Sequence, residues 1–122
     1  MRQELYPKLT VRLYGEDRCF GPGIAALLER VAQYHSLRAA ARSMDMAYSK
    51  AWTILRRAES NLGFRLLETT VGGRGGGSAA LTQEGERLLA AYRAYCRALE
   101  RYGREIFQDY FPPQDAEKPP SK

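Results

Sequence analysis

Apolar and polar positions alternate in one short stretch near the start of the chain and then recur at helical spacing over most of its length. In residues 8–14, KLTVRLY, every second side chain is apolar, which predicts a half-buried strand. A short return strand near 18–20 would complete a hairpin. After the Gly-Pro-Gly sequence at 21–23, apolar side chains recur at steps of three and four up to Tyr34. This spacing predicts an amphipathic helix that ends near His35.

Two further helices are expected in the middle of the chain, separated by a tight turn. Ser36 is a good N-cap for the short segment SLRAAARSM. Asp45 marks a turn, because Asp tolerates left-handed backbone better than most residues. A third helix is expected from about 48 to 62, and Gly63 is typical of a helix stop. The buried face of this helix is expected to consist of Ala51, Leu55, Ala58 and Leu62.

A second hairpin and a long final helix follow. Residues 64–71 predict a strand, the glycine-rich segment after it a turn, and residues 79–81 a returning strand. Thr82 is expected to cap a helix that reaches about residue 110 and is roughly 40 Å long. This order predicts a mainly α fold with a small β-hairpin wing, a winged helix-turn-helix with a long C-terminal dimerisation helix.

The final helix is longer than a domain of this size needs to cover its own core, so we expect a partner subunit along it. The residues expected at this dimer interface keep helical spacing: Leu88, Leu89, Tyr92, Tyr95, Cys96, Leu99, Tyr102 and Ile106. Residues 1–111 are expected to form one DNA-binding and dimerisation domain. The Pro-rich tail, residues 112–122, is expected to be disordered.

Composition and charge favour a globular protein that meets nucleic acid. The chain has 122 residues, of which 44% are hydrophobic and 27% are charged. No apolar run approaches the roughly 20 residues of a membrane span, so no membrane contact is expected. The first dozen residues include charged side chains and lack the apolar core of a secretory signal, so a cytoplasmic location is expected. Residues 36–75 contain seven basic and three acidic residues, and therefore hold four of the five excess positive charges. Such a concentrated positive field attracts a polyanion.

The residue pattern gives little support to metal or enzyme chemistry. Two cysteines and one histidine make neither a zinc ligand set nor a disulfide framework, so no metal and no cofactor are expected. The glycine-rich segment lacks the lysine of a phosphate-binding P-loop, because Gly77 is followed by Ser78 and Ala79. No paired carboxylates and no nucleophile with a base stand out, so we do not expect an enzyme.

The third predicted helix carries small polar and basic residues opposite its buried face. We expect Ser49, Lys50 and Thr53 to contact bases, and the two arginines that follow to contact mainly phosphates. An ordinary solvated helix face is the alternative. The glycines of the wing would let its backbone approach DNA, with Arg74 supplying charge. The full set of expected DNA-binding residues is Ser36, Arg38, Tyr48, Ser49, Lys50, Thr53, Arg56, Arg57, Gly73, Arg74, Gly75 and Gly76.

Two segments resemble a known family. AYSKAW at 47–52 and TVGGRGGGSAALTQEGERLL at 70–89 are similar to the N-terminal DNA-binding domain of the ModE-type molybdate-responsive transcription regulators, part of the LysR-like class of winged helices. The resemblance covers roughly residues 5–110. It implies a homodimer joined through the final helix, and an inverted-repeat operator in double-stranded DNA. The recognition helix maps onto 48–57 and the wing onto 72–78.

The chain also departs from this family. Members usually have a serine where this chain has Ala47, and commonly a glycine where it has Asp45. They also carry oxyanion-binding β-barrel domains after the final helix, where this chain has its Pro-rich tail. We therefore expect a sequence-specific regulator of transcription, of molybdate-related genes, that lacks the molybdate-sensing domain and has no molybdate site of its own. A signal would then come from a separate molybdate-sensing protein, from protein abundance or from another site.

A second interpretation belongs to another class of function. The chain could be a winged-helix module for protein–protein interaction, with weak and non-specific DNA binding. Selection of DNA sequences separates the two interpretations, because a true regulator enriches an inverted repeat.

Overall fold

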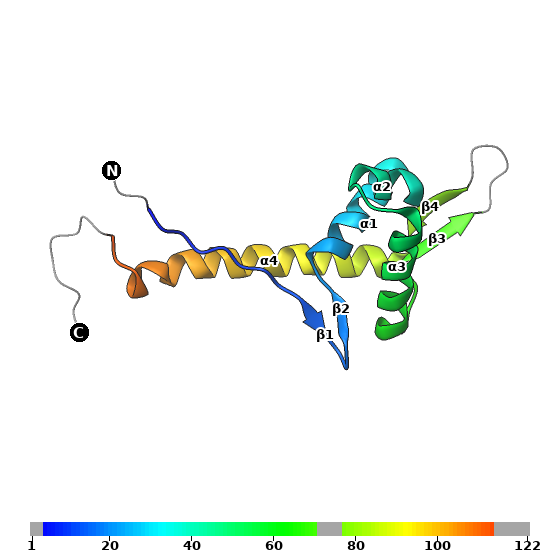
Figure 1. The fold of residues 1–122 in the computed structure, drawn as a ribbon. Coiled ribbons are helices and arrows are strands. Elements are labelled where there is room, and N and C mark those ends of the chain that lie inside the picture. Colours follow the sequence, from blue (N-terminus) through cyan, green and yellow to red (C-terminus); the bar gives the residue numbers. More distant parts are fainter. Residues whose placement is uncertain (1–3, 71–76, 114–122) are drawn as a thin grey trace. The chain divides into compact units, whose positions relative to one another are not determined.

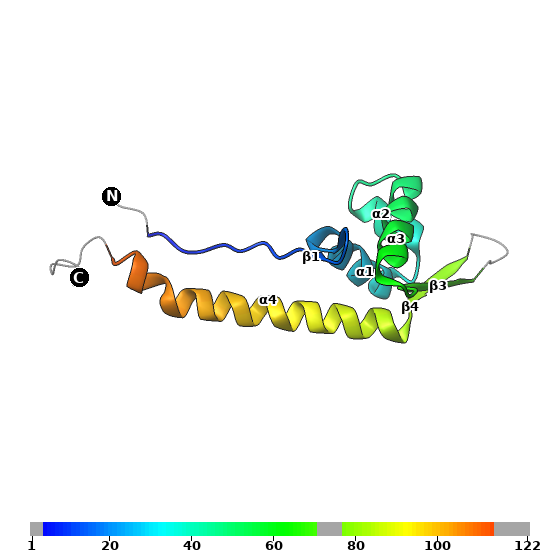
Figure 2. The same cartoon turned by 90° about the horizontal axis from the view of Figure 1, so that it is seen from below.

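The computed structural model describes residues 4–70 and 77–113, which contain four helices and two antiparallel hairpins (Figures 1 and 2). The strands are β1 (Leu13–Tyr14), β2 (Arg18–Phe20), β3 (Leu67–Thr70) and β4 (Ser78–Leu81). The helices are α1 (Pro22–Tyr34), α2 (Leu37–Ser43), α3 (Tyr48–Leu62) and α4 (Gln83–Tyr110). The predicted fold class, a mainly α winged helix-turn-helix with a long C-terminal helix, is confirmed.

The chain divides into two compact units. One unit is Thr10–Tyr92, and the other combines Met1–Leu9 with Arg93–Lys122. In the second unit, a Cβ atom added to Gly103 of α4 would lie 3.6 Å from Leu9 Cδ1. Leu9 therefore lies close to the C-terminal half of α4.

Two predictions about chain organisation stay open. The single domain of residues 1–111 stays a prediction, and most of the predicted tail, residues 114–122, lies outside the described residues. Within residues 4–70 and 77–113, no helix combines the length and the hydropathy that a membrane span requires.

The N-terminal hairpin is shorter than the sequence predicts. The expected strand over residues 8–14 is wrong in its extent, since only its last two residues form β1. A strand needs a ladder partner, and β2 ends just before Pro22 opens α1. Farther upstream, the Val11 carbonyl accepts a hydrogen bond of 2.7 Å from the Tyr92 hydroxyl instead of a strand partner.

The end of α1 and the start of α2 are as the sequence predicts, whereas α1 begins at Pro22, inside the Gly-Pro-Gly sequence that was expected to precede it. α1 ends at His35, whose backbone is left-handed (φ 59°) and whose amide donates to the Val31 carbonyl at 2.7 Å. The Ser36 hydroxyl caps α2, because it accepts a hydrogen bond of 3.0 Å from the Ala39 amide. Asp45 has φ 55° in the turn before α3, which is the left-handed conformation expected for it.

α3 has the bounds expected from the sequence. Its buried residues are Ala51, Leu55 and Ala58, and Leu62 is half-buried. Gly63 ends the helix with φ 86°. At its start, Ala47 has the extended backbone of an N-cap (φ −64°, ψ 143°) but makes no side-chain cap bond.

β3 and β4 pair in antiparallel register and form the predicted wing hairpin. The strand expected over 64–71 begins three residues later than predicted. The cause is Glu59 of α3, whose Oε2 accepts hydrogen bonds from the backbone amides of Leu66 at 2.7 Å and Leu67 at 3.2 Å. These bonds tie the incoming chain to α3 and not to a strand partner. The returning strand expected over 79–81 is confirmed, with Ser78 added.

Thr82 organises the start of α4. Its hydroxyl accepts a hydrogen bond of 2.9 Å from the Gly85 amide, which confirms the predicted cap, and donates to the Arg65 carbonyl at 2.6 Å. A Cβ atom at Gly85 would lie 2.5 Å from the Leu66 carbonyl oxygen, closer than real Cβ atoms come. Glycine at this position therefore lets α4 approach the backbone that leads into β3.

The core of the Thr10–Tyr92 unit joins the helices to both hairpins. Its largest fully buried side chains are Phe20, Leu27, Leu28, Val31, Leu55, Leu66 and Leu67. The Tyr92 ring packs edge-on against Phe20, with centroids 5.0 Å apart, and only 3% of Tyr92 is exposed. In the described residues, every buried side-chain nitrogen and oxygen has a hydrogen-bond partner.

Candidate nucleic-acid interface

α3 presents a polar and basic face opposite its buried one. The exposed residues of this face and its flank are Ser49, Lys50, Thr53, Arg56, Arg57 and Ser60. Their side chains are of the types that reach base edges and phosphates in DNA complexes. The five residues that we predicted on α3 for DNA contact beyond its first position are therefore all exposed.

Two hydroxyl groups on this face differ in what they can do. The Thr53 hydroxyl donates to the Ser49 carbonyl at 3.0 Å, so it offers a methyl group and acceptor lone pairs to a ligand. The Ser49 hydroxyl makes no hydrogen bond within the described residues, and is free to donate or accept. Ser49 is therefore the more versatile of the two for reading a base edge.

Two arginines lie against aromatic rings beside this face. The guanidinium carbon of Arg38, on α2, is 4.2 Å from the centroid of Tyr48, and that of Arg56 is 4.8 Å from Trp52. The two rings meet edge-on with centroids 6.2 Å apart. The four side chains thus form one cluster across α2 and α3, and each guanidinium rests on a ring face.

The root of the wing is fixed by hydrogen bonds. Thr70 and Ser78 close the last described pair of the hairpin through their hydroxyls, 2.7 Å apart. The Ala79 amide donates to the His35 carbonyl at 3.0 Å, so β4 is tied to the junction of α1 and α2. In both views, β3 and β4 project from the helices of this unit (Figures 1 and 2). The predicted contacts Gly73, Arg74, Gly75 and Gly76 lie outside the described residues.

Comparison with known proteins decides the family. Residues 25–86 match the family described as bacterial regulatory helix-turn-helix protein, lysR family. The match runs from α1 through the first turn of α4, and so includes α2, α3 and the wing. The chain belongs to this family. The family is one of regulatory helix-turn-helix proteins, as the sequence predicts, and is not a family of enzymes.

Several relatives named ModE resemble this LysR-family chain. It is 40% identical over 68 residues to the molybdenum transport protein ModE of Herbaspirillum seropedicae, covering 56% of this chain and 25% of the relative. It is 35% identical over 108 residues to the transcriptional regulator ModE of Haemophilus influenzae, covering 88% and 42%. It is 31% identical over 85 residues to the DNA-binding transcriptional dual regulator ModE of Escherichia coli K12, covering 70% and 30%.

These alignments confirm the resemblance to ModE-type regulators that the sequence indicates. They also bound it. The chain spans about a quarter of the first of these relatives and less than half of the second.

The predicted dimer residues of this LysR-family chain differ in exposure. Tyr95 and Tyr102 are 54% and 59% exposed, which is high for such large rings. The residues that are half-buried within the chain are Leu88, Leu89, Cys96, Leu99 and Ile106. Tyr92 is used by the chain's own core and offers little surface to a partner. The dimer interface therefore stays a prediction, with Tyr95 and Tyr102 as its most available members.

Sequence reasoning missed some contributions to the site of this LysR-family chain. It assigned no role to Arg12 and Arg18, which line one cavity together with Arg57. It also missed Glu59, which holds the entry to the wing. These residues are far apart in the sequence from their partners, so no local motif signals them. Within residues 4–70 and 77–113, no group of three His, Cys, Asp or Glu side chains could hold a metal ion.

Proposed function

We propose that this LysR-family chain binds duplex DNA in a sequence-specific manner and regulates transcription. α3 lies in the major groove, where Ser49, Lys50 and Thr53 face base edges. Arg56 and Arg38 face the phosphates on either side. The observation that carries this proposal is the exposed polar face of α3, flanked by two arginines that rest on aromatic rings.

The chain acts as a homodimer on this proposal. The exposed rings of Tyr95 and Tyr102 on α4 support a partner helix, because large exposed apolar surface marks interaction sites. A two-fold symmetric dimer presents two copies of α3, so its operator is an inverted repeat with half-sites one or more helical turns apart.

The regulated genes are proposed to be related to molybdate. The chain is proposed to act in the bacterial cytoplasm, where the chromosomal DNA lies. The support comes from the names of the relatives, which are a molybdenum transport protein and two transcriptional regulators called ModE. This part of the proposal rests on similarity, and the DNA contacts rest on the geometry of α3.

The test is selection of binding sites from random duplexes with the full chain. We expect enrichment of an inverted repeat, and the genomic copies of that repeat should lie upstream of molybdate transport or molybdoenzyme genes. Enrichment upstream of unrelated genes would refute the link to molybdate but would still support sequence-specific regulation of transcription. No enrichment, with weak binding to every duplex, would refute the proposal and favour the protein-interaction module.

A variant control ties the result to α3. Lys50→Ala should weaken enrichment of the repeat, whereas Lys8→Ala, a lysine outside the helix-turn-helix, should leave the selected sequence unchanged. If both variants selected the wild-type repeat with wild-type affinity, Lys50 would have no part in recognition.

A further inference from the structure

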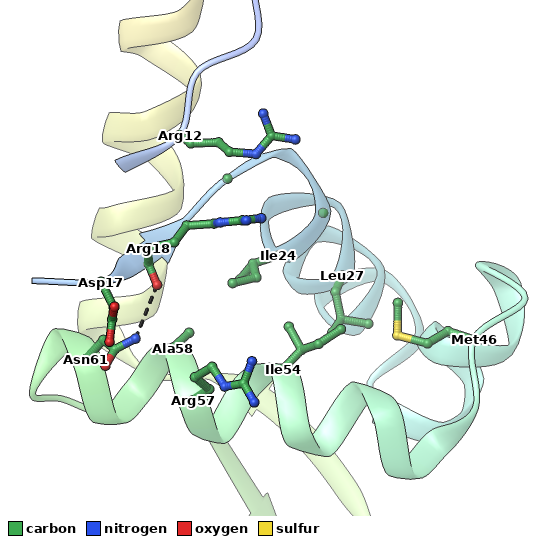
Figure 3. Close-up of a pocket in the computed structure, with 12 residues that line it drawn as sticks. Arg12, Asp17, Arg18, Ile24, Leu27, Met46, Ile54, Arg57, Ala58 and Asn61 are labelled. Atoms are coloured by element: carbon green, nitrogen blue, oxygen red, sulfur yellow. Dashed lines mark hydrogen bonds between the residues drawn. The ribbon is translucent and has the colours of Figure 1, made fainter. Parts of the chain in front are cut away.

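A cavity of about 690 Å³ lies in the Thr10–Tyr92 unit, on the flank of α3 that carries Arg57 (Figure 3). It is bordered by the β1–β2 hairpin, the first turn of α1 and one flank of α3. Its volume falls in the range of about 300–1,000 Å³ typical of small-molecule sites. Nothing in the DNA-binding role of α3 requires a cavity here.

Three arginines converge on this cavity. Arg12, just before β1, and Arg18 of β2 line one part of it, and Arg57 lines it from α3 (Figure 3). None of the three guanidinium groups makes an ion pair or hydrogen bond within the described residues. Asp17 is the one acidic residue of the lining and pairs with none of them. The cavity therefore has an excess positive charge that its own residues leave uncompensated, which favours an anion.

The cavity also has an apolar side. Ile24 of α1 and Ile54 of α3 are half-buried there, and Figure 3 shows Ile24 between Arg18 and Arg57. α1 begins at this cavity with no side-chain cap and no acidic residue in its first turn, so the positive end of the helix adds to the field of the arginines. Cationic groups beside an apolar wall match a ligand that has one anionic group and one apolar body.

We propose that this cavity binds a small organic anion, a carboxylate or phosphate ester that carries an apolar group. Binding opposes the attachment of the chain to DNA, a consequence that rests on the proposed function. The link is Arg57, which lines the cavity and is also one of the α3 residues expected to contact DNA phosphates. An anion in the cavity engages Arg57 and neutralises positive charge on the recognition helix, and both changes weaken attraction to phosphates.

The test titrates the full chain with four probes by calorimetry. The anionic probes are 1-naphthoate and 1-naphthyl phosphate, and the controls are neutral 1-naphthol and inorganic phosphate. We expect one anionic probe to bind once per chain, at least about tenfold more tightly than either control, because a charge-assisted hydrogen bond adds to burial of the ring. The stronger of the two anions identifies the carboxylate or the phosphate class. Equal affinity for all four probes would overturn the site.

Matched variants locate the binding. Arg18→Gln should weaken binding of the tighter anion about tenfold, as expected for loss of a charged hydrogen bond. Arg104→Gln removes an exposed arginine of α4 outside the cavity and should leave that affinity unchanged. Equal losses in the two variants would show a general charge effect and refute the site. The probe comparison in the unsubstituted chain does not depend on the folding of either variant.

Duplex affinity, measured separately, distinguishes failure of this inference from failure of the proposed function. If the chain binds a naphthyl anion but no duplex, the proposed anion site stands and the proposed DNA-binding function is refuted. If Arg18→Gln weakens binding to every duplex while no probe binds, these arginines contact the DNA backbone and the inference fails. Saturating anion should weaken duplex binding about fivefold, comparable to the loss of one charged contact. Unchanged duplex affinity would refute the antagonism.

Discussion

The guanidinium carbon of Arg38 lies 4.2 Å from the centroid of the Tyr48 ring, which joins α2 to the first residue of α3. Arg56 rests in the same way on Trp52, and the two rings touch edge-on. A long arginine side chain loses conformational entropy when it is ordered, so an arginine already held on a ring meets a phosphate at lower entropic cost. On the proposed function, the two rings therefore hold two arginines in place for contacts with DNA phosphates.

This arrangement predicts different effects for two substitutions of Tyr48. Tyr48→Leu removes the ring and should weaken duplex binding about two- to fivefold, the equivalent of about 0.5–1 kcal/mol for an exposed cation–π contact. Tyr48→Phe keeps the ring and should bind within about twofold of the unsubstituted chain. Fluorescence anisotropy with a labelled operator measures both. Equal losses in the two variants would instead assign the effect to the hydroxyl.

A second prediction concerns the free hydroxyl of Ser49. Ser49→Ala should flatten the base preference at one position of each half-site, at a cost of about 1 kcal/mol in discrimination, because a base-edge hydrogen bond is lost. Ser60→Ala is the matched control, since Ser60 is exposed about three turns later on the same helix. Repeating the sequence selection with both variants measures the effect. An unchanged preference in Ser49→Ala would remove this residue from base reading.

A third prediction concerns Arg74, which lies outside the described residues but between the two strands of the wing. Arg74→Ala should weaken binding to all duplexes alike, and should make the slope of log K against log salt shallower by about one unit. Arg104→Ala on α4 serves as the control of equal charge. Affinity that is unchanged at every salt concentration would contradict the assignment of a wing contact.

The helical part of this fold could be predicted well from the sequence. The bounds of α3, the cap at Ser36 and the left-handed turn at Asp45 follow from local rules, because periodicity and backbone preference act within a few residues. The strands were predicted less well. The length of β1 depends on how many residues of β2 can pair with it, and the start of β3 depends on the Glu59 carboxylate of α3. Neither fact can be read from the strand itself.

The exposed face of the candidate site was also predictable, but its supporting contacts were not. Helical spacing is sufficient to place Ser49 and Thr53 on one face of α3. It does not show that the Thr53 hydroxyl donates its hydrogen bond to a backbone carbonyl, or that Arg57 lines the same cavity as Arg18. Such contacts depend on side-chain conformation and on residues distant in sequence.

A fourth prediction follows from the close approach at Gly85. Gly85→Ala places a Cβ atom 2.5 Å from the Leu66 carbonyl oxygen, and should lower the free energy of unfolding by about 1–3 kcal/mol through overpacking. Gly103→Ala on the same helix meets only an ordinary contact of 3.6 Å, and should raise stability by up to about 1 kcal/mol. Urea denaturation followed by circular dichroism compares the two. Similar changes in both variants would contradict the proposed clash.

A fifth prediction uses two helix starts with opposite outcomes. Ala47→Ser should raise the free energy of unfolding by about 1 kcal/mol, because Ala47 has N-cap backbone geometry and no capping side chain. Ser36→Ala should lower it by about the same amount, because Ser36 caps α2. The same urea denaturation measures both. A loss of stability in Ala47→Ser would mean that a hydroxyl at this position does not cap α3.

The bond between the Ala79 amide and the His35 carbonyl has a consequence for how well the wing tolerates substitution. It anchors the root of the wing to the helices through backbone atoms, and the hydroxyls of Thr70 and Ser78 close the hairpin above it. Backbone bonds do not depend on the identity of a side chain, so substitutions along β4 should leave the root of the wing held against the junction of α1 and α2.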